Sequence, residues 1–342
     1  MSASNSWMPV NQMLWRNESL LGDQPLLVVN PPELAGWQDY KTSATFFTQD
    51  FRVHGLFEAA GLNSYFAAFP KAEPGVSSAL LYWPKSKELG RMLLAAVASI
   101  LGPKGVILIA GEHQGGVKSA QTIAEELCGQ KVIKLDNARR CTLYRIETAD
   151  AIMTFDAAKW LSTLDIEVQQ ERYKVLSYPG VFSHAELDEA TKMLLEIVSL
   201  PESGRCLDFG CGAGVIGAVV ASRKPGLTVE MLDVNALALE SSRLTCEANG
   251  VVARVFASNA WSEAEGKYDV ILSNPPFHTG LKLDFRPAAE LIKAARKHLH
   301  FDGDLTLVAN GFLPYESWLA ESFRKVHVVS ENSRFKVYKA RG

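Results

Sequence analysis

Asn274-Pro275-Pro276-Phe277 is the stretch of this chain whose residue types are best suited to chemistry. They suit attack by a planar amino nitrogen, which is a poor nucleophile because its lone pair is delocalised. An Asn side-chain oxygen and a backbone carbonyl can each accept one N–H of such an amine and turn its lone pair towards an electrophile. The two prolines offer no competing N–H, and Phe277 offers a face for stacking. A strand that simply ends in a Pro-Pro turn is the alternative interpretation.

A glycine-rich motif lies upstream of this turn. The strand expected at Arg205–Phe209 is followed at once by Gly210-Cys211-Gly212-Ala213-Gly214. Glycine permits sharp turns and a close approach of backbone to ligand, and the helix expected at Val215–Ser222 offers N–H donors at its N-terminus. The motif therefore predicts a cofactor loop. Its predicted cofactor-binding residues are Asp208, Gly210, Gly212 and Gly214.

Two further expected strands lead into polar residues. Asp233 follows the strand at Thr228–Leu232 and is placed to accept hydrogen bonds from ribose hydroxyls. Asn259 and Ala260 follow the strand at Val252–Ala257, where they can meet an adenine edge. The Asn-Pro-Pro-Phe turn ends the fourth strand of the series. Because open α/β sheets bind ligands at the carboxyl ends of their strands, we expect one site at these four ends.

The glycine motif leaves two cofactors to choose between. Gly212-x-Gly214-x-x-Gly217 satisfies the dinucleotide fingerprint, but that match alone is weak evidence for NAD. The acid two residues before the first glycine, the G-x-G-x-G spacing and the downstream turn favour a nucleoside with a sulfonium-bearing tail. S-adenosylmethionine is therefore the predicted cofactor.

Residues 205–340 resemble a class I S-adenosylmethionine-dependent methyltransferase, with D-F-G-C-G-A-G, Asp233, Asn259 and N-P-P-F in family order. Within that superfamily, the Pro179–Ser183 loop, S-N-P-P-F-H and the C-terminal R-F-K-V-Y resemble the bacterial small-subunit ribosomal RNA guanine-N2 methyltransferases, the RsmC family. The resemblance spans the whole chain. It implies methyl transfer from S-adenosylmethionine to N2 of a guanine in 16S rRNA, guanosine 1207 in the family. The catalytic residues that it implies are Asn274, Pro275, Pro276 and Phe277.

Two other functions stay open on the residues alone. The same chemistry suits adenine N6, a large-subunit rRNA guanine or a protein glutamine amide, although Tyr is commoner than Phe in the adenine and glutamine enzymes. A noncatalytic RNA-binding factor on a methyltransferase frame is the other alternative, and the intact glycine loop and turn speak against it. No strong general base is needed, because the nitrogen becomes acidic once alkylated. We therefore expect Asp208 to shape the loop rather than take the proton.

The N-terminal half repeats the order of the C-terminal half without its chemistry. In each half a strand that ends before a proline precedes a helix, a strand that leads into Gly, a second helix and a basic-apolar strand. Trp83 aligns with Asn274 and offers no amide. The strand expected at Leu26–Asn30 runs into Pro31-Pro32-Glu33 without a G-x-G. The segment Gly111–Ser119 is close to a phosphate loop, but Val stands where that loop needs Lys, which favours a plain strand-to-helix turn.

The predicted fold is α/β, with two tandem Rossmann-like class I methyltransferase domains. We expect a degenerate N-terminal domain at residues 1–160, which supports RNA binding or folding, and a catalytic domain at residues 167–342. The linker is expected near Glu147–Trp160. Ser183-x-x-Glu186 predicts a capping box that opens a helix running to Val198, which would hold the preceding loop beside the site.

Composition limits the class of protein. At 342 residues the chain is long enough for two cores, and its hydrophobic share of 47% is typical of globular proteins. We expect no membrane span, because no apolar run reaches about 18 residues, and no signal peptide. Five cysteines without C-x-x-C spacing predict reduced thiols in a cytoplasm and no metal site. A monomer is expected.

The formal charge of −3 argues against a strongly basic coat, although a local basic patch suffices for RNA. The expected partner is 16S rRNA or the small ribosomal subunit. Basic residues enrich the C-terminal strand, and a solvated face is the alternative interpretation of them. They are Arg334, Lys336, Lys339 and Arg341.

Overall fold

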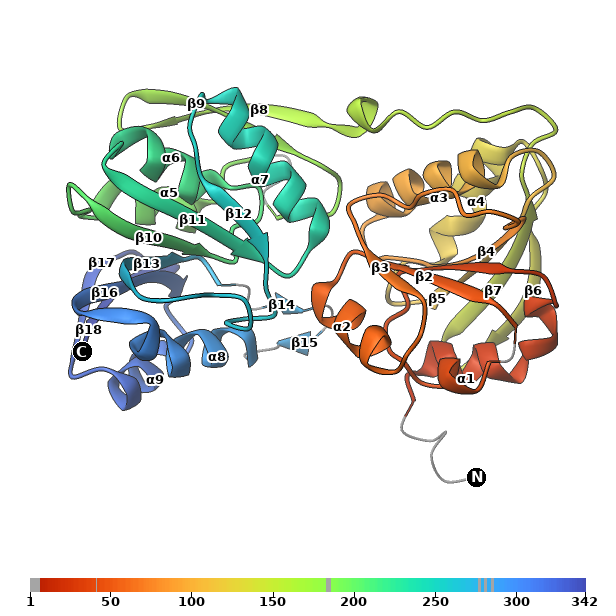
Figure 1. The fold of residues 1–342 in the computed structure, drawn as a ribbon, viewed down its shortest axis with the longest axis horizontal. Helices are drawn as coiled ribbons and strands as arrows, with labels where there is room; N and C mark the ends of the chain where they lie inside the picture. Colours follow the sequence, from red (N-terminus) through yellow and green to blue (C-terminus); the bar gives the residue numbers. More distant parts are fainter. Residues whose placement is uncertain (1–6, 41, 183–185, 276–277, 280–281, 284–285) are drawn as a thin grey trace. The chain divides into compact units, whose positions relative to one another are not determined.

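The computed structural model describes residues 7–40, 42–182, 186–275, 278–279, 282–283 and 286–342. The chain divides into two compact units, Met1–Trp160 and Leu161–Gly342. Each unit contains one seven-stranded sheet with helices on both faces (Figure 1).

The two sheets share one topology. The strand order is β3-β2-β1-β4-β5-β7-β6 in the N-terminal unit and β12-β11-β10-β13-β16-β18-β17 in the C-terminal unit. In each sheet six strands run in one direction, and the strand next to last in the order, β7 or β18, runs against them. The predicted fold, two tandem Rossmann-like α/β domains, is confirmed.

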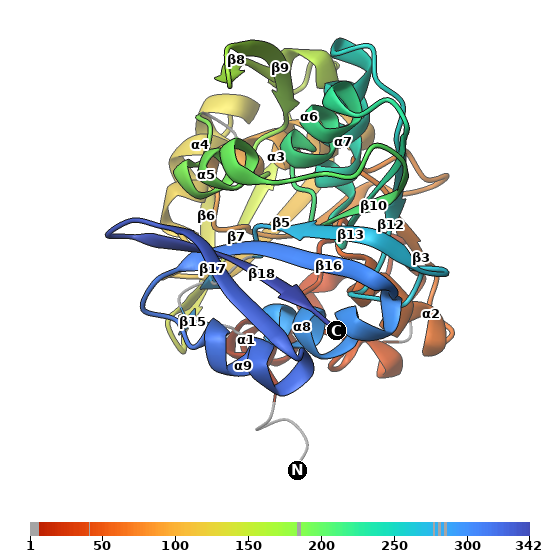
Figure 2. The ribbon, with the colours of Figure 1, turned by 90° about the vertical axis from the view of Figure 1, so that its left-hand side faces the viewer.

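The C-terminal unit places its helices on both faces of the sheet (Figure 2). The strands are β10 (Gly204–Phe209), β11 (Leu227–Asp233), β12 (Arg254–Ala257), β13 (Tyr268–Ser273), β16 (Leu299–Asn310), β17 (Lys325–Glu331) and β18 (Phe335–Arg341). The helices of one face are α5 (Glu189–Ile197), α6 (Val215–Arg223) and α7 (Ala236–Ala248). Those of the other face are α8 (Arg286–Ala295), which continues into the 3-10 turn Arg296–His298, and α9 (Tyr315–Ser322).

Continuous apolar runs form the central strands of this sheet because helices cover both of its faces. Leu207 of β10, Ile271 of β13 and Leu305 of β16 pack in one fully buried cluster with side chains of α8 and α9. The strand that leads into the Asn-Pro-Pro-Phe turn is therefore held in the middle of the sheet, between β10 and β16. Its carboxyl end has little freedom to move.

Two antiparallel hairpins complete the C-terminal unit. The first joins β8 (Ser162–Val168) to β9 (Glu171–Ser177), and the second joins β14 (His278–Thr279) to β15 (Lys282–Leu283). Residues 161–166 lie between the two expected domains; they belong to this unit, and 162–166 form part of β8, the first strand of its first hairpin.

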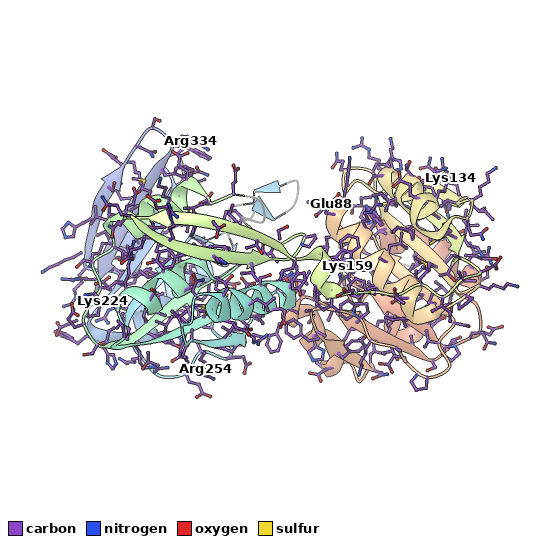
Figure 3. The ribbon with its side chains drawn as sticks, turned by 90° about the horizontal axis from the view of Figure 1, so that it is seen from above. Glu88, Lys134, Lys159, Lys224, Arg254 and Arg334 are labelled. Carbon is purple, nitrogen blue, oxygen red and sulfur yellow. The ribbon has the colours of Figure 1, made fainter. Side chains whose placement is uncertain are left out.

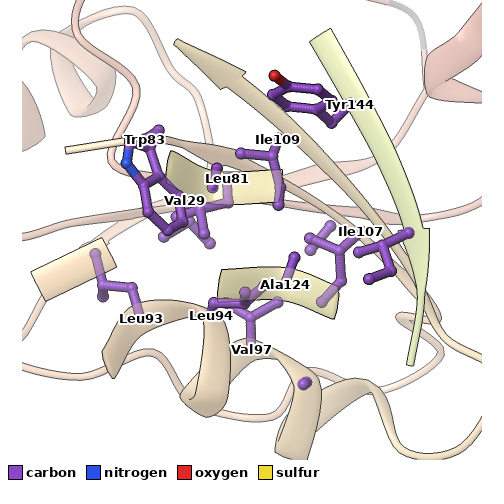
Figure 4. Close-up of a cluster of buried hydrophobic side chains, with 14 of the residues drawn as sticks. Val29, Leu81, Trp83, Leu93, Leu94, Val97, Ile107, Ile109, Ala124 and Tyr144 are labelled. Carbon is purple, nitrogen blue, oxygen red and sulfur yellow. The ribbon is translucent and has the colours of Figure 1, made fainter. Parts of the chain in front are cut away.

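The N-terminal unit surrounds its own apolar core. Its strands are β1 (Leu26–Val29), β2 (Ala44–Thr48), β3 (Ser64–Phe66), β4 (Ser78–Tyr82), β5 (Val106–Glu112), β6 (Ile133–Ala138) and β7 (Cys141–Glu147). Its helices are α1 (Pro9–Arg16), α2 (Phe51–Ala59), α3 (Lys87–Leu101) and α4 (Lys118–Cys128), with 3-10 turns at Glu18–Leu21, Trp37–Asp39 and Ala157–Trp160. Trp83 lies inside the cluster formed with α3 and α4, next to Val29 and Leu81 (Figure 4).

The predicted capping box at Ser183 is wrong. The helix begins at Glu189, and its N-cap is Asp188, whose carboxylate accepts the backbone N–H of Thr191 at 2.8 Å. Glu186 lies in a bend before the helix, and Ser183 lies outside the described residues. The pattern Asp188-x-x-Thr191 performs the capping, because a carboxylate accepts orphan N–H groups at a helix N-terminus at least as well as a hydroxyl does.

Three observations concern the part of the chain that the structure describes. No helix there is long and apolar enough to cross a membrane. No group of three or more His, Cys, Asp and Glu side chains there is arranged to hold a metal ion. All five cysteines are free and buried.

Candidate active site

The glycine loop follows β10 directly and turns back over the end of the neighbouring strand. Gly210, Gly212 and Gly214 have φ of +73°, +55° and +78°, a region that side chains with a Cβ rarely adopt. A Cβ at Gly214 would also lie 2.8 Å from Cα of Ser242 on α7. Space is open beside Gly210, where an added Cβ would meet no heavy atom within 4 Å. The loop therefore presents bare backbone at the carboxyl edge of the sheet.

Asp233 closes this loop from the end of β11. Its Oδ2 accepts the backbone N–H of Gly212 at 3.0 Å, and its Oδ1 accepts that of Asn235 at 2.9 Å. Asn235 in turn is the N-cap of α7. The carboxylate is half-buried, and its position is fixed by two strands and a helix terminus. It lies beside the glycine backbone, as the sequence predicts.

Asp208 lies beneath the loop. It is fully buried, and its Oδ2 accepts the backbone N–H of Gly217 in α6 at 2.9 Å. Its Oδ1 has no hydrogen-bond partner among the described residues. Burial raises the pKa of this carboxyl to about 7, an increase that the Gly217 N–H opposes and the charge of Asp233 reinforces. The geometry is that of a group that supports the loop from below.

Asn259 and Ala260 form the turn after β12, next to Asp233. Ala260 has a φ of +51°, and its carbonyl accepts the hydroxyl of Ser258 at 2.7 Å. The backbone N–H of Asn259 donates to the hydroxyl of Ser262, while the Asn259 side chain is exposed. This turn and the glycine loop lie at one edge of the sheet, because the strands that carry them are parallel.

Asn274 is held from the side by the N-terminus of α5. Its Nδ2 donates to Oδ2 of Asp188 and to the hydroxyl of Thr191, each at 2.8 Å. A carboxylate at this distance only accepts hydrogen bonds, so the amide nitrogen must face α5 and Oδ1 must point away from it. The preceding Ser273 donates to the carbonyl of Phe209, which ties the turn to the glycine loop. The side-chain oxygen of Asn274 is therefore presented in a fixed orientation.

The rest of the turn is only partly described. Pro275 is buried, whereas Pro276 and Phe277 lie outside the described residues. The Asp188 and Thr191 contacts with Asn274 were not foreseen in the sequence. Asp188-x-x-Thr191 is recognisable there as a helix start, but its link to a residue more than eighty positions later is not.

The loop before α5 approaches the glycines. The backbone N–H of Tyr178 donates to the hydroxyl of Ser241 on α7 at 3.2 Å. An added Cβ at Gly212 would lie 3.8 Å from Cβ of Phe182, whose side chain is exposed. The segment before Ser183 thus lies beside the glycine loop, as the sequence predicts for Pro179–Ser183.

Sheet register identifies the counterpart of Asn274 in the N-terminal unit. Ser273 pairs with Leu307 of β16, which pairs with Tyr338 of β18. In the N-terminal sheet the corresponding series is Leu81, Ile109 and Tyr144. The two series correspond because Tyr338 and Tyr144 each end an Arg-x-x-x-Tyr pattern, which starts just before β18 and β7.

Tyr82, and not Trp83, therefore stands where Asn274 stands, and the alignment made from the sequence is wrong by one residue. Pro84 and Pro275 suggested the alignment of Trp83 with Asn274, but the strand pairing shows that it is shifted by one residue. The Tyr82 hydroxyl donates to Oδ1 of Asn11 on α1 at 2.6 Å, so even the contact with the first helix has its counterpart. The conclusion that this half lacks the amide is unchanged.

The other site positions of the N-terminal unit are also altered. Thr48 occupies the place of Asp233, and its hydroxyl accepts the N–H of Asp50, the N-cap of α2. Asn30 occupies the place of Gly210 and forms two hydrogen bonds with Gln49, each at 2.9 Å. A side-chain ladder thus fills the region that bare glycine backbone leaves open in the C-terminal unit.

The similarity to known proteins extends over nearly the whole chain. Residues 172–339 match the protein family described as "Methyltransferase small domain", and residues 11–164 match "Methyltransferase small domain N-terminal". A protein of Aeromonas hydrophila subsp. hydrophila named "Ribosomal RNA small subunit methyltransferase C" is 40% identical over 338 residues, which cover 96% of this chain and 97% of that protein. A protein of the same name from Pseudoalteromonas atlantica is 37% identical, with coverage of 96% and 97%.

A solved structure is similar over almost the full length. It is described as "T. Thermophilus 16S rRNA N2 G1207 methyltransferase (RsmC) in complex with AdoMet and Guanosine", with a TM-score of 0.84 and 23% identity. The match covers 98% of this chain and 92% of that one, and it supports the shared fold. Identity of 40% over nearly the full length confirms the family that the sequence motifs predict. The chain belongs to the Ribosomal RNA small subunit methyltransferase C family.

Proposed function

We propose that this chain transfers a methyl group from S-adenosylmethionine to the exocyclic N2 of a guanine in 16S rRNA, at guanosine 1207. The names of the curated relatives and the contents of the T. thermophilus complex support this activity. The observation that carries the proposal is the Asn274 amide, whose nitrogen is bound by α5 and whose oxygen points away from it. This amide follows the strand next to β10, at the edge where the glycine loop lies.

The residues around the glycine loop fit the cofactor. Gly210 and Gly212 would accommodate it along their half-buried backbone, and Gly214 would close the loop against α7. Asp233 would accept hydrogen bonds from its ribose hydroxyls in place of the Gly212 N–H. Asn259 and Ala260 would contact the adenine. The open space beside Gly210 and the positive φ of the three glycines support this assignment. S-adenosylmethionine supplies, when bound, a methyl group on a sulfonium cation.

Asn274 would orient the guanine amine. Its Oδ1 and the carbonyl of Pro275 would each accept one N–H of N2, so that the lone pair is turned towards the methyl group. Extrusion of a stacked base costs a few kcal/mol, and stacking on Phe277 would return about 1–3 kcal/mol. The alkylated nitrogen is acidic enough to release its proton to water. Asp208 is not assigned as a base, because it lies beneath the loop and already accepts the Gly217 N–H.

The remaining assignments are part of the same proposal. We expect the protein to act as a monomer in the cytoplasm and to bind 16S rRNA or the small subunit without a metal ion. The N-terminal domain, residues 1–160, would support RNA binding or folding, and the catalytic domain would include residues 167–342. The altered positions of the N-terminal unit support a noncatalytic role for it.

Mass mapping of 16S rRNA from cells that lack this protein tests the function. One methylated guanine should be missing, and it should return with the wild-type protein but not with Asn274→Ala. Loss of a methylated adenine, of a large-subunit guanine or of a protein glutamine would each replace the proposed acceptor. An unchanged modification pattern would refute the proposal.

A further inference from the structure

We infer that a rim beside Asn274 binds an unpaired nucleotide that neighbours the target guanine, with its base stacked on Phe312 and its phosphate on Arg334. The rim consists of Gly311, Phe312, Arg334 and Lys336. The inference rests on the proposed function, because it takes the partner to be RNA with a guanine at Asn274. It adds a recognition surface outside the glycine loop and the Asn-Pro-Pro-Phe turn.

The rim is tied to the support of Asn274 by short links. Asp188, which binds the Asn274 amide, is followed in α5 by Glu189. The carboxylate of Glu189 forms an ion pair with the guanidinium of Arg334, the residue just before β18. One helix terminus therefore contacts both Asn274 and the rim.

A backbone hydrogen bond connects the two halves of the rim. The N–H of Gly311 donates to the carbonyl of Arg334 at 2.9 Å, and Phe312 is the next residue. Both segments lie at the carboxyl edge of the sheet, because β16 runs parallel to β13 and β18 runs against it. A nucleotide that contacts the rim would thus lie at the same edge as Asn274.

Phe312 is 74% exposed and lies within a hydrogen-bonded turn. The N–H of Leu313 donates to the carbonyl of Asn310 at 3.1 Å, and the side chains of Leu313 and Tyr315 are buried. A single exposed aromatic residue is ordinary on a protein surface. What distinguishes Phe312 is its hydrogen-bonded turn, its place in the chain directly after Gly311, which contacts Arg334 and Lys336, and its position at the carboxyl edge of the sheet. Aromatic side chains of this kind stack unpaired bases regardless of sequence.

The cations of the rim are available to a phosphate. Arg334 uses one N–H of its guanidinium for Glu189, and its side chain is 66% exposed. The Lys336 side chain lies against Gly311, where an added Cβ would be 3.7 Å from its Cγ, and pairs with Glu331 at 3.5 Å. The Arg334 pair is exposed and the Lys336 pair is half-exposed. Ion pairs in contact with solvent contribute little stability, so a phosphate can compete for the cations. By contrast, Lys339 and Arg341 pair with the buried Asp304 and are excluded from the rim.

The N-terminal unit provides an internal comparison. There the N–H of His113 donates to the carbonyl of Arg140 at 2.7 Å, which is the same contact as that between Gly311 and Arg334. The hydrogen bond between the two segments is therefore preserved, and so is the arginine. The positions of Phe312 and Lys336 are occupied by Gln114 and Thr142. The aromatic surface and the second cation occur only in the unit that has the glycine loop.

Binding of the full-length protein to unmodified 16S rRNA tests the stacking residue. Phe312→Ala should weaken RNA affinity about 5- to 150-fold, while affinity for S-adenosylmethionine, measured by calorimetry, stays unchanged. Phe312→Tyr should retain RNA affinity. Phe301→Ala is the matched control, because Phe301 is 80% exposed but lies near the start of β16, at the opposite edge.

Salt dependence separates the phosphate contact from stacking. Arg334→Gln should reduce the slope of log affinity against log salt by about 1, whereas Phe312→Ala should leave that slope unchanged. Arg254→Gln is the control, because Arg254 is also exposed and paired with a Glu, but begins β12 on another side of the unit (Figure 3).

If neither Phe312→Ala nor Phe301→Ala lowers RNA affinity, while the wild-type protein methylates 16S rRNA, the rim is overturned and the proposed function stands. An equal loss in both variants would also overturn it, because exposed aromatic surface in general would then explain the effect. If the wild-type protein neither binds nor methylates 16S rRNA, the proposed function fails first.

Discussion

Tyr82 and Asn274 stand at equivalent places in the two sheets, and each contacts the first helix of its unit. Asn274 donates through nitrogen to Asp188 and Thr191, which leaves its oxygen for another partner. The Tyr82 hydroxyl donates to Asn11, and its ring is buried in the core. In the C-terminal unit the contact with the helix thus orients the Asn274 amide and leaves its oxygen available. In the N-terminal unit the equivalent contact uses the Tyr82 hydroxyl and leaves no amide at this position.

The same contrast applies to the cofactor region. Three glycines with positive φ follow β10 and leave open space beside Gly210, whereas Asn30, hydrogen-bonded to Gln49, follows β1. The fold is kept where the residues of the site are replaced, because the sheet and helices are stabilised by burial of apolar side chains rather than by the residues at the carboxyl edge. Function therefore depends on a few positions grafted on a shared fold.

The largest expected effect separates Asn274 from its counterpart. Asn274→Ala should lower the single-turnover methylation rate about 10²- to 10⁴-fold, by analogy with placed acid–base groups, with cofactor affinity nearly intact. Tyr82→Phe should leave the rate unchanged, because it alters only a structural contact. Rapid-quench methylation of 16S rRNA at saturating S-adenosylmethionine measures both. A wild-type rate for Asn274→Ala would show that Asn274, like Tyr82, has only a structural role.

A charge exchange sharpens this result. Asn274→Asp places a carboxylate against Asp188 and removes the N–H that joins them, so we expect a loss comparable to that of Asn274→Ala. Adding Asp188→Asn restores a donor and an acceptor at this contact and should recover part of the rate. No recovery in the double variant would argue against the fixed amide orientation.

The second prediction concerns cofactor affinity. Asp233→Ala should weaken S-adenosylmethionine binding about 10- to 150-fold, the scale of a charge-assisted hydrogen bond of about 1.5–3 kcal/mol. Thr48→Ala, at the equivalent place in the N-terminal unit, should have no effect. Calorimetry should also give one site per chain, which Gly212→Val abolishes. Two sites, or sensitivity to Thr48→Ala, would mean that the N-terminal unit retains cofactor binding.

The third prediction tests Asp188 as a positioning residue. Asp188→Ala should lower the methylation rate about tenfold by releasing the Asn274 amide, without raising KM for RNA. Asp50→Ala is the control, because it also removes an N-cap, that of α2, from the other unit. It should reduce stability by a comparable amount, about 0.5–2 kcal/mol, and leave the rate alone. In the Asn274→Ala background, Asp188→Ala should have no further effect on rate; full additivity would contradict the coupling.

The smallest expected effect concerns Asp208, whose counterpart in the N-terminal unit is Val28. Burial raises the pKa of Asp208 from 3.8 to about 7, so the folded state holds a proton that the unfolded state releases within this pH window. Stability therefore falls as pH rises through the window and stays lower above it. Asp208→Asn should raise Tm of the cofactor-free protein at pH 8 by about 2–8 °C, and the gain should disappear towards pH 4. Thermal unfolding across pH measures this.

The exposed Asp302→Asn is the control for that experiment and should show no such trend. A stabilisation by Asp208→Asn that is the same at pH 4 and pH 8 would show that the carboxyl does not titrate as proposed. Cofactor at saturation should shrink the effect, because a bound cation lowers the pKa of a nearby acid.

The local motifs were readable because each depends on neighbours in the chain. The strand Tyr268–Ser273 ends directly before the Asn-Pro-Pro-Phe turn, as the sequence predicts, because an apolar run followed by two prolines favours a strand that stops there. Alternating glycines before an apolar segment likewise predict the loop and α6. The shared topology of the two units followed from the repeated order of their elements. The rRNA acceptor came from family resemblance, because no local pattern names a nucleotide.

Contacts across the sheet were decided only by tertiary structure. Asp188 meets Asn274 from 86 residues away, and Gly311 meets Arg334 across two strands, because helix packing and strand register bring them together. Register also makes Tyr82 rather than Trp83 the equivalent of Asn274, although the following prolines suggest the other alignment. A pairing shift of one residue exchanges the two faces of a strand. The sequence by itself thus determines which residue types follow each strand at the carboxyl edge of the sheet. Which of these residues contact one another is determined by strand register and helix packing, because the apolar faces of the strands must be buried.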